Sequence, residues 1–124
     1  MAKVMCVGCG PMTVEYFKLE GNFHLIELDS KDSAERFLES LTSGTVPDII
    51  VLGKVLWRGL PRKRIKRDMI NFAERLKHRA PTAMIILLND TVSHRRSPRS
   101  ITAACNSDPV IALSTIRRIL SPTG

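Results

Sequence analysis

The sequence predicts an α/β fold: a three-layer, doubly wound domain built on a five-stranded parallel sheet. The first observation is segment 47–53, where the apolar run Ile-Ile-Val-Leu lies between Pro-Asp and Gly. A run without polar alternation is typical of a strand buried on both faces by helices. The second is the alternation of short apolar runs with helical patterns along the 124 residues. Since crossovers between parallel strands are right-handed, helices should cover both faces, with strand order 2-1-3-4-5.

The first half of the chain is predicted to supply three strands and two helices. The strands are expected at 3–7, 23–28 and 49–52. Thr13 is expected to cap a helix that continues to about Leu19, because its hydroxyl can accept a bond from the open amides of the first turn. Asp32 and Glu35 have the spacing of a capping box, and the helix they open should end at Ser43-Gly44.

The second half is predicted to complete the fold with two more strands. A basic loop to about Pro61 should lead into a helix that continues to Arg79, because apolar residues recur there at helical spacing. These core positions are Ile65, Met69, Phe72, Ala73 and Leu76. A polar, basic loop is expected at 91–99. The remaining predicted elements are a strand at 83–88, a short helix at 101–105, a strand at 109–113 and a helix at 115–120 capped by Ser114.

Composition and charge indicate a single globular domain over residues 1–124. Hydrophobic residues make up 44% and charged residues 25%, and no run approaches the roughly 20 apolar residues of a membrane span. The absence of a signal-like start and the odd count of three cysteines favour a cytoplasmic protein without disulfides. A net charge of +7 favours an acidic partner, either a protein or a nucleic acid, and no membrane partner is expected.

Several segments together resemble the receiver domains of bacterial response regulators. Val-Pro-Asp-Ile-Ile-Val-Leu at 46–52 is similar to the segment leading to their phosphoacceptor strand. The helix with Ala34 and Leu38, and the run at 81–88, are similar to the second helix and fourth strand of the family. Receivers place an acidic pair after the first strand and a phosphoacceptor aspartate after the third. The spacing maps these positions to Gly8/Cys9 and to Gly53.

The sequence departs from the family pattern where phosphoryl transfer takes place. The degenerate pocket implied by the resemblance consists of Gly8, Cys9, Gly53, Lys54 and Asn89, and the usual lysine position falls at Leu113 or Ser114. Aspartyl phosphorylation needs a carboxylate nucleophile and oxygen ligands for Mg²⁺. The resemblance therefore implies a pseudo-receiver: a regulatory module without enzymatic activity, metal or cofactor, which acts by protein contact, for example in transcription regulation. It also permits a homodimer through about 101–120.

The turn after the first strand supports a second interpretation. Val-Gly-Cys-Gly-Pro at 7–11 also resembles the first motif of S-adenosylmethionine-dependent methyltransferases. Asp29 follows Cys9 by 20 residues, where a nucleotide-binding sheet carries its ribose-binding carboxylate. This interpretation places S-adenosylmethionine or a nucleotide at Gly8, Gly10 and Asp29. The structural alternative is a tight β–α turn followed by an ordinary acidic residue, since the third glycine of the motif is missing.

Segment 54–67 carries the strongest signal that core packing does not explain. It holds seven cationic residues and no acidic one. Together with the arginines of the 91–99 loop, it should form a positive surface for an acidic protein or a nucleic acid, with Trp57 stacking on a base. The residues assigned to this surface are Lys54, Trp57, Arg58, Arg62, Lys63, Arg64, Lys66, Arg67, Arg95, Arg96 and Arg99. The structural alternative is a solvated helix face.

The cysteines and histidines do not form a recognised metal motif. Cys6 and Cys9 have Cys-x-x-Cys spacing, but a zinc site needs a second pair of ligands. The remaining candidates, His24, His78, His94 and Cys105, are scattered. Cys6 lies inside the first predicted strand, so it is expected to be a small buried apolar residue rather than a redox group.

Overall fold

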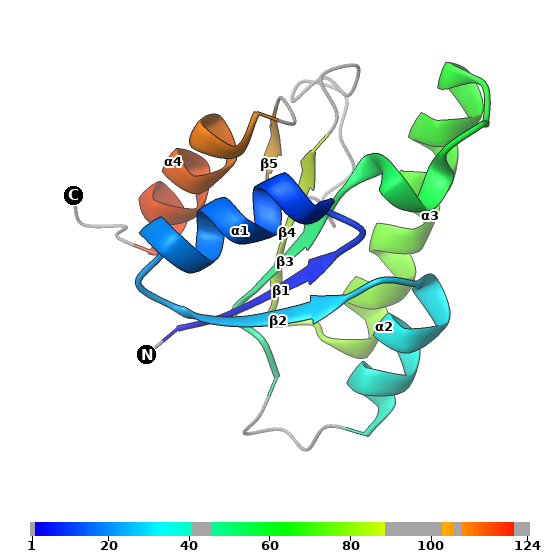
Figure 1. Ribbon diagram of the computed structural model, residues 1–124. Helices are drawn as coiled ribbons and strands as arrows, with labels where there is room; N and C mark the ends of the chain where they lie inside the picture. The colour runs from blue at the N-terminus through cyan, green and yellow to red at the C-terminus, as the bar shows by residue number, and fades with distance from the viewer. Residues whose placement is uncertain (1, 41–45, 89–102, 106–107, 121–124) are drawn as a thin grey trace.

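The computed structural model describes residues 2–40, 46–88, 103–105 and 108–120, which form a three-layer α/β fold (Figure 1). The parallel sheet has the order β2-β1-β3-β4-β5, which confirms the predicted topology. Its strands are β1 (Lys3–Val7), β2 (His24–Leu28), β3 (Ile49–Leu52), β4 (Met84–Leu88) and β5 (Ala103–Cys105). The helical elements are α1 (Pro11–Glu20), α2 (Lys31–Glu39), the 3-10 helix η1 (Lys54–Trp57), α3 (Arg62–Arg79) and α4 (Pro109–Leu120).

Strand β3 lies at the centre of the sheet and is buried along its whole length. Ile50 pairs in register with Met5 of β1 and with Ile85 of β4. Successive side chains of a strand point to opposite faces, so β3 contributes to two separate cores. Ile50 and Leu52 pack under α2 and α3, whereas Ile49 and Val51 pack under α1 and α4. Both faces of the sheet are therefore covered, as the unbroken apolar run predicted (Figure 1).

Two helices begin at residues other than the predicted caps. Gly10 precedes α1 at its amino end and Thr13 is buried inside the helix, so the capping role predicted for Thr13 is wrong. Ser30, not Asp32, caps α2: its Oγ accepts a hydrogen bond of 3.0 Å from the Ser33 amide. Asp32 instead lies in the first turn, where its negative charge interacts favourably with the positive end of the helix dipole. The end predicted at 43–44 lies outside the described residues.

The assignments at the carboxyl-terminal end were wrong. Ala103–Cys105 is a strand that pairs with β4, not a helix, and Pro109–Leu120 is one continuous helix where a strand was predicted at 109–113. Asp108 Oδ1 accepts a 2.9 Å hydrogen bond from the Val110 amide, so the helix begins there and Ser114 lies within it. Small residues such as Ala-Ala-Cys carry little strand signal, and pairing with β4 decides their conformation.

Helix α3 follows the predicted stripe and is the longest helix in the described part of the chain, with 18 residues. Met69, Phe72, Ala73 and Leu76 are buried. None of residues 62–68 is buried, and these first turns project beyond the sheet (Figure 1). The predicted loop before α3 contains η1. Within the described ranges, no helix has the length and apolarity needed to cross a bilayer.

Candidate functional site at the carboxyl edge of the sheet

Gly53, which directly follows β3, packs against the loop between β1 and α1. Its amide donates a 2.9 Å hydrogen bond to the Val7 carbonyl. A Cβ atom built on Gly53 would lie 2.5 Å from Cys9 Cα and still closer to the carbonyl oxygen of Gly8. These neighbours are backbone atoms, which cannot rotate away as the end of a flexible side chain can. The structure therefore has no space for a side chain at position 53.

Leu56 of η1 covers Gly8 from the other side. The Val55 amide donates a 3.2 Å hydrogen bond to the Gly8 carbonyl, which draws η1 onto the loop. A Cβ atom built on Gly8 would lie 2.5 Å from Leu56 Cγ, and the φ of +63° at Gly8 further favours glycine. We call the packed unit of Gly8, Cys9, Gly53 and Leu56 the closed turn.

The closed turn occupies the place where the sequence predicted a degenerate pocket. The structure brings Gly8, Cys9 and Gly53 together from two segments more than 40 residues apart, as the spacing indicated. Lys54 is half-buried at the start of η1, and Asn89 lies outside the described residues. Neither Gly8, Cys9 nor Gly53 has a carboxylate or hydroxyl, so these three provide neither an oxygen nucleophile nor side-chain oxygen ligands for a metal.

Cys6 and Cys9 lie on the α1/α4 side of the sheet and are free thiols. Cys9 Sγ donates a hydrogen bond of 3.5 Å to the Val51 carbonyl. Hydrogen bonding to Cys9, together with burial, raises the pKa of the Cys6 thiol well above its ordinary value. Cys6 is buried, as the sequence predicted, and its raised pKa means that it does not supply a thiolate. Among the described residues, no three His, Cys, Asp or Glu side chains are grouped to hold a metal.

The raised pKa of Cys6 predicts an alkaline loss of stability. The folded protein holds the thiol proton to higher pH than the unfolded chain does. The contribution of this thiol to the free energy of unfolding is complete below the ordinary thiol pKa and is lost as the pH rises above that value. Urea unfolding at pH 7 and pH 10 should show a larger loss of unfolding free energy for the wild type than for Cys6→Val. Parallel losses in the two proteins would contradict the assignment, because the two proteins differ only at this thiol.

A small cavity lies beside the closed turn, where the ligand interpretation placed Gly8, Gly10 and Asp29. Its volume is about 200 Å³, below the roughly 300–1,000 Å³ of typical small-molecule sites. Glu27 and Asp29 line it, and their carboxylates disfavour the phosphates of a nucleotide. Pro11 at the start of α1 lacks the amide that could donate to such a ligand. The three predicted residues do meet, but in a space too small for S-adenosylmethionine or a nucleotide without rearrangement.

The basic segment lies on the surface, with one exception. Its exposed members are Arg58, Arg62, Lys63, Arg64 and Arg67, and Lys66 is half-buried. Trp57 is only 1% exposed and packs edge-to-face against Phe72, with ring centroids 6.0 Å apart. The prediction that Trp57 stacks on a base is therefore wrong, because the apolar ring is part of the core beneath α2 and α3. Arg95, Arg96 and Arg99 lie outside the described residues.

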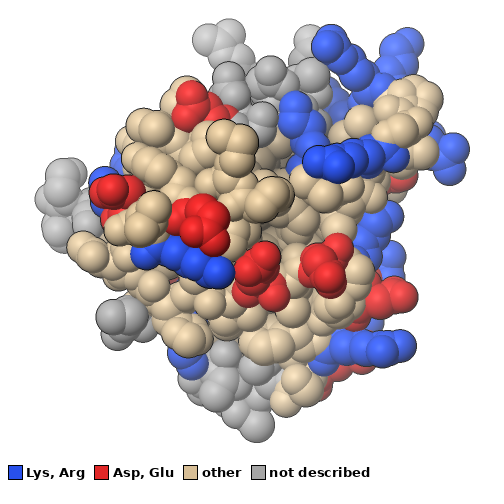
Figure 2. Space-filling view, in the orientation of Figure 1, with Lys and Arg blue, Asp and Glu red and all other residues tan. Residues whose placement is uncertain are grey.

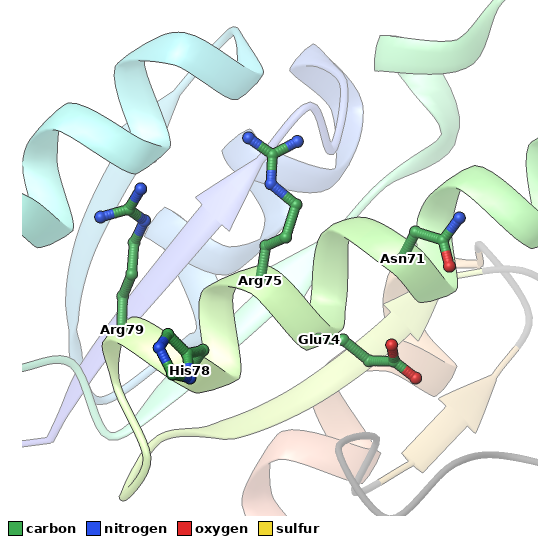
Figure 3. A pocket seen from close by; sticks show the side chains of 5 residues that line it. All are labelled: Asn71, Glu74, Arg75, His78 and Arg79. Atoms are coloured by element: carbon green, nitrogen blue, oxygen red, sulfur yellow. The ribbon is translucent and has the colours of Figure 1, made fainter.

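Sequence reasoning missed an open hollow on α3, which is shown in Figure 3. Arg75 and Arg79 extend from it toward α2, while Glu74 points away. Arg75 forms an ion pair with Glu35, and Arg79 Nη1 lies 2.7 Å from Glu39 Oε1. The sequence did contain a signal for these ion pairs, because the two glutamates of α2 and the two arginines of α3 are each four residues apart. These contacts join α2 to α3, so we assign them to structure rather than to ligand binding. The hollow is lined by Asn71, Glu74, Arg75, His78 and Arg79.

Comparison with known proteins shows which fold this arrangement represents. No protein-family model and no curated protein matches the sequence. Among solved structures, the signal receiver domain of an HD domain-containing protein from Pseudomonas fluorescens Pf-5 matches with a TM-score of 0.62 at 11% identity. The match covers 97% of this chain and 94% of that domain. The chain has a receiver-like fold.

Two further structures agree on the receiver-like fold. The BeF3-activated DrrB receiver domain matches with a TM-score of 0.58 at 16% identity, over 98% of both chains. The N-terminal domain of a response regulator/sensory box/GGDEF 3-domain protein from Carboxydothermus hydrogenoformans has a TM-score of 0.60 and 11% identity. That match covers 98% of this chain and 95% of the other. Identities this low establish the fold alone.

The observed β5 corrects one position of the receiver comparison. The resemblance assigns the lysine position to Leu113 or Ser114, on the expectation of a strand at 109–113. Both residues lie in α4, and Leu113 is buried. The Asn-Ser sequence of 106–107 directly follows β5 and lies outside the described residues. The sequence there is not basic either.

Proposed function

We propose that the protein is a receiver-like regulatory module that does not accept a phosphoryl group and acts by contact with a protein partner. The observation that carries this proposal is the absence of side-chain space at Gly53. In the receiver-like fold, this residue stands where the resemblance places the phosphoacceptor. A glycine there provides no nucleophile, and the backbone of Gly8 and Cys9 closes the position itself.

The closed turn also removes the switching step that phosphorylation would drive. A phosphoryl group can shift a conformational equilibrium only through interactions that differ between the two states. Here the loop is joined to its surroundings by three backbone hydrogen bonds: Gly8 N to Leu28 O, Gly53 N to Val7 O and Val55 N to Gly8 O. The module would therefore present one fixed surface, and its regulation would come from whether the partner is present.

Exposed apolar side chains on the α1/α4 layer support a contact function. Met12 and Leu19 of α1 are 80% and 79% exposed, and Val110 and Ile111 of α4 are also exposed. The two helices lie side by side on one face of the sheet (Figure 1). Burial of such side chains favours association with another protein. The homodimer through 101–120 stays a prediction, which light scattering of the wild type and Ile111→Glu would test.

Phosphodonor treatment tests the proposal directly. Incubation of the purified protein with acetyl phosphate and Mg²⁺, followed by intact-mass spectrometry, should show no added phosphoryl group. A receiver domain that carries the phosphoacceptor aspartate serves as the positive control under the same conditions. A hydroxylamine-sensitive mass increase of about 80 Da, mapped to this chain, would overturn the proposal, because phosphoryl transfer to a carboxylate is the chemistry that it excludes.

S-adenosylmethionine or nucleotide binding at Gly8, Gly10 and Asp29 is the competing function. Thermal unfolding with S-adenosylmethionine, NAD and ATP distinguishes it. A ligand at about one hundred times its dissociation constant adds roughly 2.7 kcal/mol to the folded state. We expect no shift from any of them. A shift that Asp29→Asn abolishes would instead favour the ligand-binding function.

A further inference from the structure

The first turns of α3 carry cations around most of the exposed helix surface. We call this set the basic arc; it consists of Arg62, Lys63, Arg64, Lys66 and Arg67. At 3.6 residues per turn, each residue advances by about 100°, so the five side chains cover an arc of roughly 200°. The apolar stripe that begins at Ile65 and Met69 lies on the opposite side. Lys and Arg gather over this projecting end of the molecule (Figure 2).

The basic arc does not stabilise the helix that carries it. Cations near the amino end of a helix oppose the dipole, and α3 has neither an acidic residue in its first turn nor a side-chain cap. Within the described part of the chain, the only ion pair found for the arc is Arg64 with Asp68, where Arg64 Nε lies 3.9 Å from Asp68 Oδ2 and the Arg64 side chain is largely exposed. Such a pair contributes little. The positive charge is therefore available to an external anion.

We propose that the basic arc binds the phosphate backbone of duplex DNA. The major groove of B-form DNA is about 12 Å wide, admits an α-helix and has phosphates along both edges. A projecting helix with cations on both flanks can contact both edges at once. A flat acidic protein surface would face only part of a 200° arc. A-form RNA presents a major groove that is too narrow for a helix.

The composition of the arc also selects against other nucleic acids. Single-strand binding depends on exposed aromatic rings that stack on bases, and Trp57 and Phe72, the nearest aromatic side chains on either side of the arc in sequence, are both buried. The arc itself contains only lysine and arginine, so contacts with phosphates dominate. Binding is expected to depend strongly on salt and weakly on base sequence. This inference is independent of the closed turn, because a protein that accepted phosphate would still present the same arc.

Fluorescence anisotropy with a labelled 20-base-pair duplex of mixed sequence tests this proposal. Because each neutralised phosphate contributes a slope of about −0.9 to log K against log salt, the five cations predict a slope of about −4.5. Affinity should therefore fall by more than about a hundredfold between 50 and 200 mM salt. Arg62→Glu/Arg67→Glu should weaken binding at 50 mM salt by at least about tenfold and reduce the slope by about two units.

A matched control distinguishes loss of the arc residues from a general reduction in net charge. Arg36→Glu/Arg118→Glu lowers the formal charge by the same four units, at exposed positions on α2 and α4. It should bind more tightly than the arc variant. Glutamates in the first turns of α3 interact favourably with the positive end of the helix dipole, so the arc variant should remain folded. Circular dichroism checks that loss of binding does not reflect unfolding.

Three results would overturn the proposal. The first is equal binding by the arc variant and the control, or no binding by the wild type at 50 mM salt. The second is tighter binding of single-stranded DNA or duplex RNA than of duplex DNA. The third is polyglutamate of equal charge competing as effectively as unlabelled duplex, which would assign the arc to an acidic protein partner. None of these results bears on phosphate uptake, so each proposal fails separately.

Discussion

Gly53→Ala is expected to lower the free energy of unfolding by about 3 kcal/mol, at the upper end of the usual cost of overpacking a core. The added methyl group would overlap the backbone of Gly8 and Cys9, and the loop can relieve this only by breaking its hydrogen bonds to β3 and η1. Urea unfolding monitored by circular dichroism measures the loss. Gly53→Asp should be at least as unstable and should remain unphosphorylated, because restoring the carboxylate does not restore the pocket.

Gly59→Ala provides the control for this prediction. A Cβ atom at Gly59 meets nothing within 4 Å, but φ is +85°, so the expected cost is the backbone strain alone, about 1–2 kcal/mol. Gly53 has an ordinary extended backbone with φ of −94°, so its cost comes from the overlap rather than from conformation. If Gly53→Ala proved as stable as the wild type, the turn would not be closed, and the main support for the proposed function would be lost.

Trp57→Ala is expected to cost about 3–5 kcal/mol, as large aromatic-to-alanine changes in cores do. The indole packs against Phe72, and Lys31 Nζ lies 5.2 Å from its ring centroid, so the change leaves a cavity beneath α2 and α3. In thermal unfolding, we expect the midpoint to fall by more than about 10 °C, if the variant folds at all.

Trp57→Phe tests the reason for this effect. The indole Nε1 is buried without a hydrogen-bond partner among the described residues, which is a cost that phenylalanine does not carry. The smaller aromatic ring should therefore retain much of the stability that alanine loses. If Trp57→Ala instead had the same unfolding midpoint as the wild type but lost DNA affinity, Trp57 would be a contact residue, and its placement in the core would be wrong.

Local sequence patterns were sufficient for most of the sheet. The unbroken apolar run of β3 and the helical spacing of Met69, Phe72 and Leu76 each depend on neighbouring residues, so they could be recognised without tertiary contacts. The carboxyl-terminal elements could not. Ala103–Cys105 is a strand because β4 offers an open edge, and Val110 and Ile111 are helical although their side chains favour strands.

The candidate site was predictable in position but not in shape. The spacing of Gly8, Cys9 and Gly53, read with the receiver resemblance, placed the three residues together at the carboxyl edge of the sheet. Nothing in the spacing indicated that the loop backbone would lie directly on Gly53. The burial of Trp57 was missed for a related reason: a tryptophan among seven cations resembles a surface residue until the path of η1 is known.

Four properties could be read from the amino-acid sequence: the fold class, the strand order, the absence of a carboxylate at position 53 and the density of cations in 54–67. They depend on residue identity and on the pattern of neighbouring residues. Three others required the three-dimensional structure: the closure of the turn, the place of Trp57 in the core and the spread of the α3 cations around a projecting helix. Those properties depend on where separate segments of the backbone meet, and such contacts between distant residues leave no periodic pattern in the chain.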